Sequence, residues 1–242
     1  MLVVPDAARI ACWLNAWLAG RESTDEVIDA ISWGGRRIEF IGGGNLESMS
    51  VAFLLAELRR LQVSRVAVAL PRPGDLVGLG GPGEFNAAAL DAGEAIVLDG
   101  ARVGFVPARF DTATSWVGRA ASPPTYLPDI AQADRDLRHA LLHAANGLAE
   151  LDVSSWSPDA ADAVMNLRTS ARLDCPMALP SAAATRMTVS ALRCSTIVEL
   201  ARRDHGGAAT SKEMAARSET LHLLDRASRA ALVAACSSLD GR

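Results

Sequence analysis

Apolar and polar positions recur with both helix-like and strand-like periods in the first half of the chain, and with helical periods alone in the second half. Apolar residues of Leu46–Leu61 recur every three or four positions, which predicts an amphipathic helix. The run Ser64–Leu70 is continuously apolar, as is typical of a buried parallel strand. With a strand at Ile38–Ile41 before the helix, this order predicts a βαβ unit whose strands lie side by side.

A hairpin is expected after this unit. The apolar runs Ala95–Leu98 and Arg102–Pro107 flank Asp99–Gly100, and an Asp-Gly pair in this setting favours a tight hairpin turn. The stretch between the two units, Pro71–Phe85, is too rich in proline and glycine for a regular element. The first part of the chain therefore predicts a small mixed sheet with two or three helices.

The second half indicates a helical bundle. A loop at Ser115–Asp129 is rich in proline, and beyond it helices are expected over Asp129–Leu151, from Ser157, over Ser181–Arg203 and from a capping box at Thr210–Glu213. The sequence thus predicts an α+β fold with a mixed α/β module at 1–115, a Pro-rich linker at 116–128 and a bundle of about four helices at 129–242. Because each part is small for an independent core, we expect the two to pack together.

Composition points to a folded bacterial protein. Half of the residues (50%) are hydrophobic and 21% are charged, and of 24 basic residues only Lys212 is a lysine. Such use of alanine and arginine is typical of GC-rich genomes, as in actinobacteria. The four cysteines show no C-x-x-C spacing and predict free thiols. With no basic n-region at the start and no apolar run of ~20 residues, we expect a cytoplasmic protein without membrane contact.

Glycines stand where the expected strand leads into the Leu46–Leu61 helix. Backbone N–H groups at a helix N-terminus can bind a phosphate or carboxylate, and the loop after the next strand would form the other wall of such a site. The stretch lacks the G-x-G-x-x-G and P-loop patterns, so a purely structural turn is the competing interpretation. The candidate ligand-binding residues are Gly42, Gly43, Gly44, Asn45 and Asp75.

Charge is distributed unevenly in the second half. Residues Asp129–Asp162 are mainly acidic and residues Arg168–Arg203 mainly basic, so we expect the two blocks to neutralise each other within the bundle. A protein partner, or the chain itself, is the alternative, and the net charge of −4 disfavours nucleic acid. Aromatic residues of the linker could bind a partner or pin the linker to the body. The candidate partner-binding residues are Trp116, Tyr126, Arg168, Arg172 and Arg193.

No catalytic constellation is evident in the sequence. The chain has no G-x-S-x-G, S-x-x-K or H-E-x-x-H motif. His139 and His143 are four apart on one helical face but lack a third ligand nearby, so we expect no metal and no cofactor. The sequence favours a non-catalytic interaction or regulatory protein that acts through its helical part and loops. An enzyme or sensor for a small anionic ligand is the alternative, and a nucleic-acid accessory protein is a third hypothesis.

Overall fold

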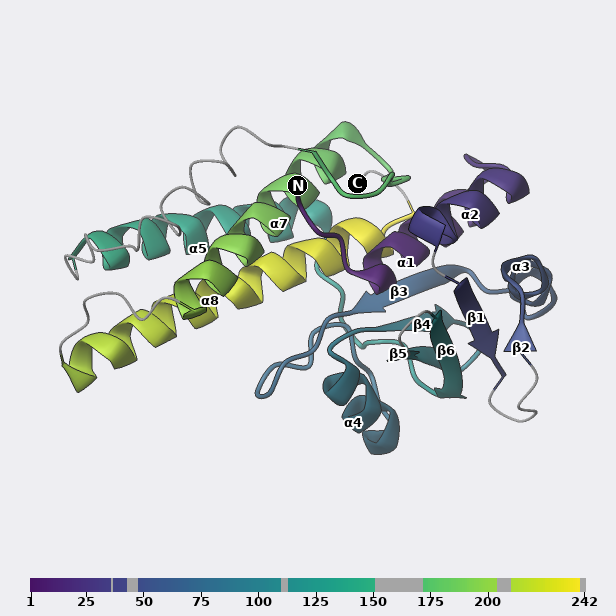
Figure 1. Cartoon of the computed structure of the whole chain (residues 1–242), viewed down its shortest axis with the longest axis horizontal. Coiled ribbons are helices and arrows are strands. Elements are labelled where there is room, and N and C mark those ends of the chain that lie inside the picture. The colour runs from purple at the N-terminus through teal and green to yellow at the C-terminus, as the bar shows by residue number, and fades with distance from the viewer. Residues whose placement is uncertain (36, 43–47, 110–112, 151–171, 204–209, 240–242) are drawn as a thin grey trace.

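The computed structural model describes the chain except for residues 36, 43–47, 110–112, 151–171, 204–209 and 240–242. Its first part holds a six-stranded sheet, and its second part is helical, which confirms the α+β class (Figure 1). The first part contains α1 (Asp6–Leu18), α2 (Thr24–Ile31), β1 (Arg37–Ile41), β2 (Ser48–Met49), α3 (Val51–Arg60), β3 (Arg65–Ala69), α4 (Gly83–Ala92), β4 (Ala95–Asp99), β5 (Val103–Arg109) and β6 (Ala113–Ala120). The second part contains α5 (Ile130–Glu150), α7 (Ala182–Arg203) and α8 (Ser211–Ser237).

The order of the strands differs from the expected βαβ arrangement. The sheet runs β2-β1-β6-β5-β4-β3, and among its described neighbouring pairs only β1–β6 is parallel. The expectation that the strands before and after α3 lie side by side is therefore wrong. An aromatic cluster explains the observed pairing, because Phe40 of β1 stacks on Trp116 of β6 with ring centroids 6.4 Å apart and meets Phe105 of β5 edge-on at 5.4 Å.

The continuous apolar sequence of β3 is explained by helices on both of its faces. Val66 and Val68 pack into the main core, to which α1 and α8 contribute. Ala67 and Ala69 pack on the other face against Phe85 of α4. An apolar run therefore predicted a strand covered on both faces, although the strand proved to be antiparallel to its neighbour.

Elements that short sequence motifs predict lie at the expected positions. β4 and β5 form the expected hairpin, with Leu98 opposite Val103. The capping box of Thr210 and Glu213 begins α8. The expected loops Pro71–Phe85 and Ser115–Asp129 are both too long, since α4 begins at Gly83 and β6 occupies 113–120. The helix expected from Ser157 lies outside the described residues.

α8 joins the two parts of the chain. It packs against α5 and α7 and also against α1 and β3, and in Figure 1 it crosses the middle of the molecule. Asn15 of α1 donates from its side-chain amide to the carbonyl oxygens of Val66 (2.8 Å) and Cys236 (2.9 Å). Among the described helices, none is both long enough and apolar enough to span a lipid bilayer.

Candidate functional site

The glycine-rich turn does not lead directly into a helix. β1 ends at Ile41, and β2 pairs back on it with Ser48 opposite Ile41. α3 begins only at Val51, where the hydroxyl of Ser50 accepts a 3.3 Å hydrogen bond from the N–H of Phe53. The helix N-terminus is thus capped from its own sequence and is separated from the turn by a strand. Gly42 is half-buried at the end of β1, while Gly43, Gly44 and Asn45 lie outside the described residues.

The structure also places Asp75 far from this turn. Asp75 follows β3, which forms the opposite edge of the sheet from β2 and runs antiparallel to β1. The ends of β1 and β3 therefore point in opposite directions, as Figure 1 shows. The expectation that Asp75 and Gly42 line one ligand site rested on parallel neighbouring strands, and it is wrong for that reason.

Asp75 instead belongs to a buried ion-pair network centred on Arg229. The guanidinium of Arg229, a residue of α8 that is 4% exposed, donates from Nη2 to Asp75 at 2.8 Å and from Nε to Asp225 at 3.1 Å. Its Nη1 donates to the carbonyl oxygen of Leu70 at 2.8 Å. All three nitrogens are thereby engaged, and the loop after β3 is tied to α8.

A groove of about 570 Å³ opens beside this network, and we call it the loop–α8 groove. It lies between the loop after β3, the Pro-rich segment before α5, and one face of α8. Three large apolar side chains on its rim are exposed: Tyr126 (71%), Leu76 (48%) and Leu223 (40%). The remaining lining includes Asp75, Val77, Leu79, Pro124, Pro128, Asp136, Arg226, Ala227 and Ala230.

Of the candidate partner-binding residues that the structure describes, Tyr126 alone lines this groove. Trp116 is fully buried in β6, so it cannot contact a partner from a loop, and its placement in the linker was wrong. The sequence does not indicate this strand, because of its alternating buried residues, Thr114, Trp116 and Gly118, only Trp116 is a large apolar residue. Arg172 is exposed near the N-terminus, where its carbonyl oxygen accepts a 2.9 Å hydrogen bond from Leu2. Arg193 is half-buried on α7, and Arg168 lies outside the described residues.

The acidic and basic blocks form no ion pair with each other in the described residues, although α5 and α7 are in contact. α5 and α7 each pack chiefly on α8. The described ion pairs of these helices join Arg138 to Asp134 within α5, and Arg202 of α7 to Asp225 of α8 at 3.7 Å. No described pair joins α5 to α7, while residues 151–171 of both blocks lie outside the description. His139 and His143 are exposed, and the described residues contain no group of three metal-ligating side chains.

A second hollow of about 390 Å³, lined in part by Arg229, lies where the sheet meets α7, α8 and the N-terminal segment. Glu94, 5% exposed, lies in its wall, and we call it the Glu94 cavity. The carboxylate of Glu94 accepts a 2.7 Å hydrogen bond from the N–H of Ala7 and forms an ion pair with Arg109. Burial raises the pKa of the Glu94 carboxyl above 4.5, and the Ala7 N–H and the Arg109 charge oppose that rise.

Neither Arg229 nor Glu94 is among the site residues predicted from the sequence. Arg229 could have been found as a charged pair with Asp225, four residues earlier, on the side of the helix that carries Leu221, Leu224 and Leu232. Glu94 follows Gly93 at the start of an apolar strand, where a charged residue is unusual. Its partners Ala7 and Arg109 are distant in sequence, and no local pattern indicated them.

Two family models match the chain. The model described as Rv1486c-like protein, N-terminal domain, matches residues 7–132, and the model described as Rv1486c-like protein, C-terminal domain, matches residues 131–233. The uncharacterized proteins Rv1486c of Mycobacterium tuberculosis strain H37Rv and MT1533 of strain CDC 1551 are each 32% identical over 120 residues, and each match covers 40% of this chain and 42% of the relative. The match thus spans less than half the length of these curated relatives. No solved structure matches the chain.

Proposed function

This chain belongs to the Rv1486c-like family, and we propose that it is a non-catalytic, cytoplasmic interaction protein that binds an apolar segment of a partner protein in the loop–α8 groove. The observation that carries this proposal is the convergence of Leu76, Tyr126 and Leu223 on one hollow while each remains substantially exposed. Single exposed apolar residues are common on protein surfaces, but a contiguous set around a groove is typical of a binding site.

Rigidity of the groove supports the same proposal. Arg72 and Asp75 exchange two backbone hydrogen bonds of 2.8 and 2.9 Å, and Leu70 donates to the carbonyl oxygen of Val77 at 3.2 Å. Arg229 fixes the side chain of Asp75 from beneath. A wall that is already ordered loses little conformational entropy on binding, which favours affinity.

Charge indicates the chemistry of the partner. The carboxylate of Asp75 is neutralised by Arg229 at 2.8 Å and approached by Arg226 at 3.7 Å. Asp136 and Arg226 then contribute one acid and one base to the exposed rim, so the groove carries no strong field of either sign. This balance fits an uncharged, apolar peptide segment anchored on Tyr126 better than nucleic acid or an acidic tail.

A photo-cross-linking amino acid at position 126 tests the proposal. In a mycobacterial host we expect it to cross-link to an apolar segment of one partner protein, identified by mass spectrometry. The matched control is the same group at Phe53, an aromatic residue of α3 that is 53% exposed and lies outside the groove. The cross-link should be absent at position 53 and weakened by Leu76→Ala and Leu223→Ala.

Three outcomes would overturn the proposal. One is the absence of any cross-link at position 126, and another is an identical set of cross-linked proteins at positions 126 and 53. The third is a cross-link to a second copy of this chain, which would make the groove a self-association surface.

A further inference from the structure

The Glu94 cavity has a wall in which most polar groups already have partners. Arg229 uses all three of its nitrogens, as described above. The hydroxyl of Thr196 donates to the carbonyl oxygen of Leu192 at 2.8 Å. Glu94 accepts from Ala7 and pairs with Arg109. These groups form a fixed frame and leave little hydrogen-bonding capacity of their own.

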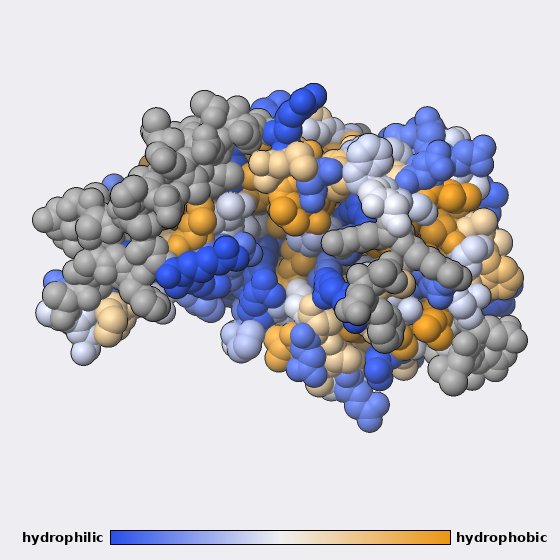
Figure 2. Space-filling model, in the orientation of Figure 1, coloured by the Kyte–Doolittle hydropathy of each residue, from blue (hydrophilic) through white to orange (hydrophobic). Residues whose placement is uncertain are grey.

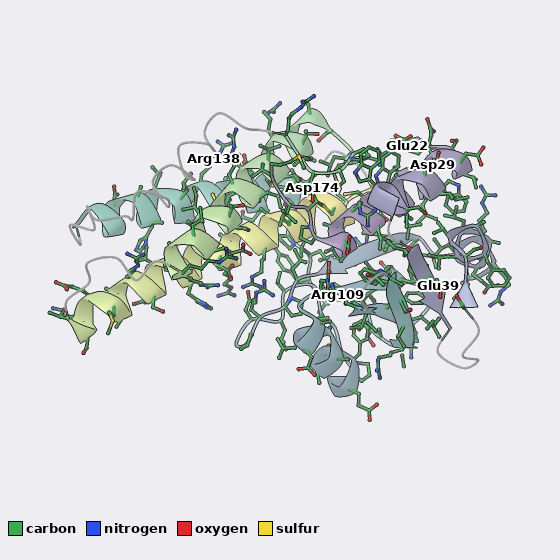
Figure 3. The ribbon with its side chains drawn as sticks, viewed as in Figure 1. Glu22, Asp29, Glu39, Arg109, Arg138 and Asp174 are labelled. Atoms are coloured by element: carbon green, nitrogen blue, oxygen red, sulfur yellow. The ribbon has the colours of Figure 1, made fainter. Side chains whose placement is uncertain are left out.

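Two guanidinium groups at the same cavity retain spare donors. Arg72 is exposed, and its side chain has no hydrogen-bond or ion-pair partner in the described part of the chain. A Cβ on Gly93 would lie 2.9 Å from Arg72 Nη1. This guanidinium therefore lies over Gly93, the residue that precedes Glu94. The side chain of Arg109 is 49% exposed, and within the described residues Glu94 and the carbonyl oxygen of Ala92 use only part of its donor fork. Arg109 lies where the sheet meets the helices in Figure 3.

Apolar side chains form another part of the cavity lining. Leu70, Leu192 and Leu232 are each less than 5% exposed and form its inner lining, and Met1 and Val3 border its mouth. Figure 2 shows apolar residues exposed in the centre of this face, between the helices on the left and the sheet module on the right, with hydrophilic residues around them. A hollow with a few converging cationic donors and an apolar interior is the usual form of a small-molecule site.

We propose that the Glu94 cavity binds a small organic monocarboxylate, with the carboxylate on Arg72 and Arg109 and the apolar body against Leu70, Leu192 and Leu232. Arginine donors match a planar carboxylate in geometry and charge. Buried Glu94 holds Arg109 at the mouth and is therefore a positioning residue.

Charge and size limit the class of ligand. Three arginines (Arg72, Arg109 and Arg229) and three acids (Glu94, Glu199 and Asp225) line the cavity, so its formal charge is balanced. Exposed Glu199 would repel a doubly charged phosphate or a nucleotide more strongly than a singly charged carboxylate. The volume of about 390 Å³ lies near the lower end of the range for ligand pockets. These limits favour one negative charge on a short apolar body.

Calorimetric titration of the full chain with hexanoate tests this inference. Hexan-1-ol, which has the apolar chain without the negative charge, and inorganic phosphate, which has the charge without the apolar chain, are the comparison probes. We expect saturable one-to-one binding of hexanoate, and binding of either other probe at least about tenfold weaker. Arg72→Gln, which breaks no described interaction, should weaken hexanoate binding about tenfold or more. Arg119→Gln is the matched control, because Arg119 is exposed on β6 outside the cavity.

The inference fails if hexanoate shows no saturable binding up to about 10 mM, if hexan-1-ol or inorganic phosphate binds as well, or if Arg72→Gln and Arg119→Gln behave alike. Tyr126→Ala should leave hexanoate binding unchanged. This site and the loop–α8 groove therefore stand or fall separately.

Discussion

The carboxylate of Glu94 caps a helix that begins 88 residues earlier in the chain, through a 2.7 Å hydrogen bond from the N–H of Ala7. The residue before α1 is Pro5, which offers no side-chain acceptor to the first turn. Glu94 supplies this acceptor from the position just before β4 and at the same time holds Arg109 at the cavity. One buried carboxylate thus links the first helix, the sheet and the proposed ligand site.

Glu94→Ala should lower the free energy of unfolding by about 1–3 kcal/mol, because the Ala7 N–H loses its buried acceptor and Arg109 loses its counter-charge. Urea denaturation followed by circular dichroism measures this. Glu219→Ala, at an exposed position on α8, should change stability by less than about 0.5 kcal/mol. Equal stability of the two variants would show that the Glu94 contacts contribute nothing.

The raised pKa of Glu94 predicts a pH dependence of stability. Burial raises the folded-state pKa above 4.5, so the folded state binds this proton more tightly than the unfolded state. The contribution of Glu94 to stability is therefore fully present below pH 4.5 and is lost as the pH rises through the folded-state pKa. Glu94→Gln removes this titration, so the variant-minus-wild-type difference in unfolding free energy should increase with pH above 4.5. A difference that stays constant with pH would contradict the raised pKa.

Arg229 should be one of the most sensitive positions in the chain. Arg229→Met leaves the largely buried carboxylates of Asp75 and Asp225 without their closest counter-charge, and we expect a loss of about 3–5 kcal/mol of stability. Arg226→Ala is the control, since that side chain is 64% exposed and lies 3.7 Å from Asp75. Its effect should be about 0–1 kcal/mol. Similar unfolding free energies for both variants would show that the Arg229 ion pairs contribute little to the stability of the fold.

Three of the cysteines should resist alkylation in the folded protein. Burial raises the pKa of the Cys12 thiol well above its ordinary value and raises the pKa of the Cys194 thiol to about 11. Burial also raises the pKa of the Cys175 thiol to about 12, and the charge of Asp174 adds to that rise. A thiol with such a pKa holds almost no reactive thiolate at pH 8. Mass spectrometry after brief iodoacetamide treatment should find these three unmodified, and modified once the chain is unfolded. Rapid modification of folded Cys12 or Cys194 would contradict the burial of these thiols.

Elements with local chemical signals could be predicted from the sequence. The capping box at Thr210 and the Asp99–Gly100 turn both depend on residues within a few positions of one another. Sheet order could not be predicted in the same way, because the pairing of β1 with β6 depends on Phe40 and Trp116, which are far apart in sequence. The sequence-derived βαβ unit therefore placed β3 beside the wrong strand.

For the candidate sites too, single residues could be predicted from nearby sequence, but contacts between distant residues could not. The sequence predicts Tyr126 as a binding residue because it is aromatic and lies in a Pro-rich segment, and it predicts Asp75 because that residue lies in a loop after a strand. Their meeting at one groove depends on α8, which presents Leu223 to the groove and, 154 residues after Asp75, presents Arg229. Only the assembled fold brings these residues together, so the groove had no signature in any single stretch of sequence.

The affinity of the loop–α8 groove for the partner segment found by cross-linking at position 126 tests the central claim most directly. Fluorescence anisotropy with that segment as a labelled peptide should give a Kd that rises at least about tenfold in Tyr126→Ala, because a central aromatic anchor is lost. Phe53→Ala should bind as tightly as the unaltered chain, since Phe53 lies outside the groove. Equal affinity of the unaltered chain and Tyr126→Ala for the peptide would contradict the proposed function.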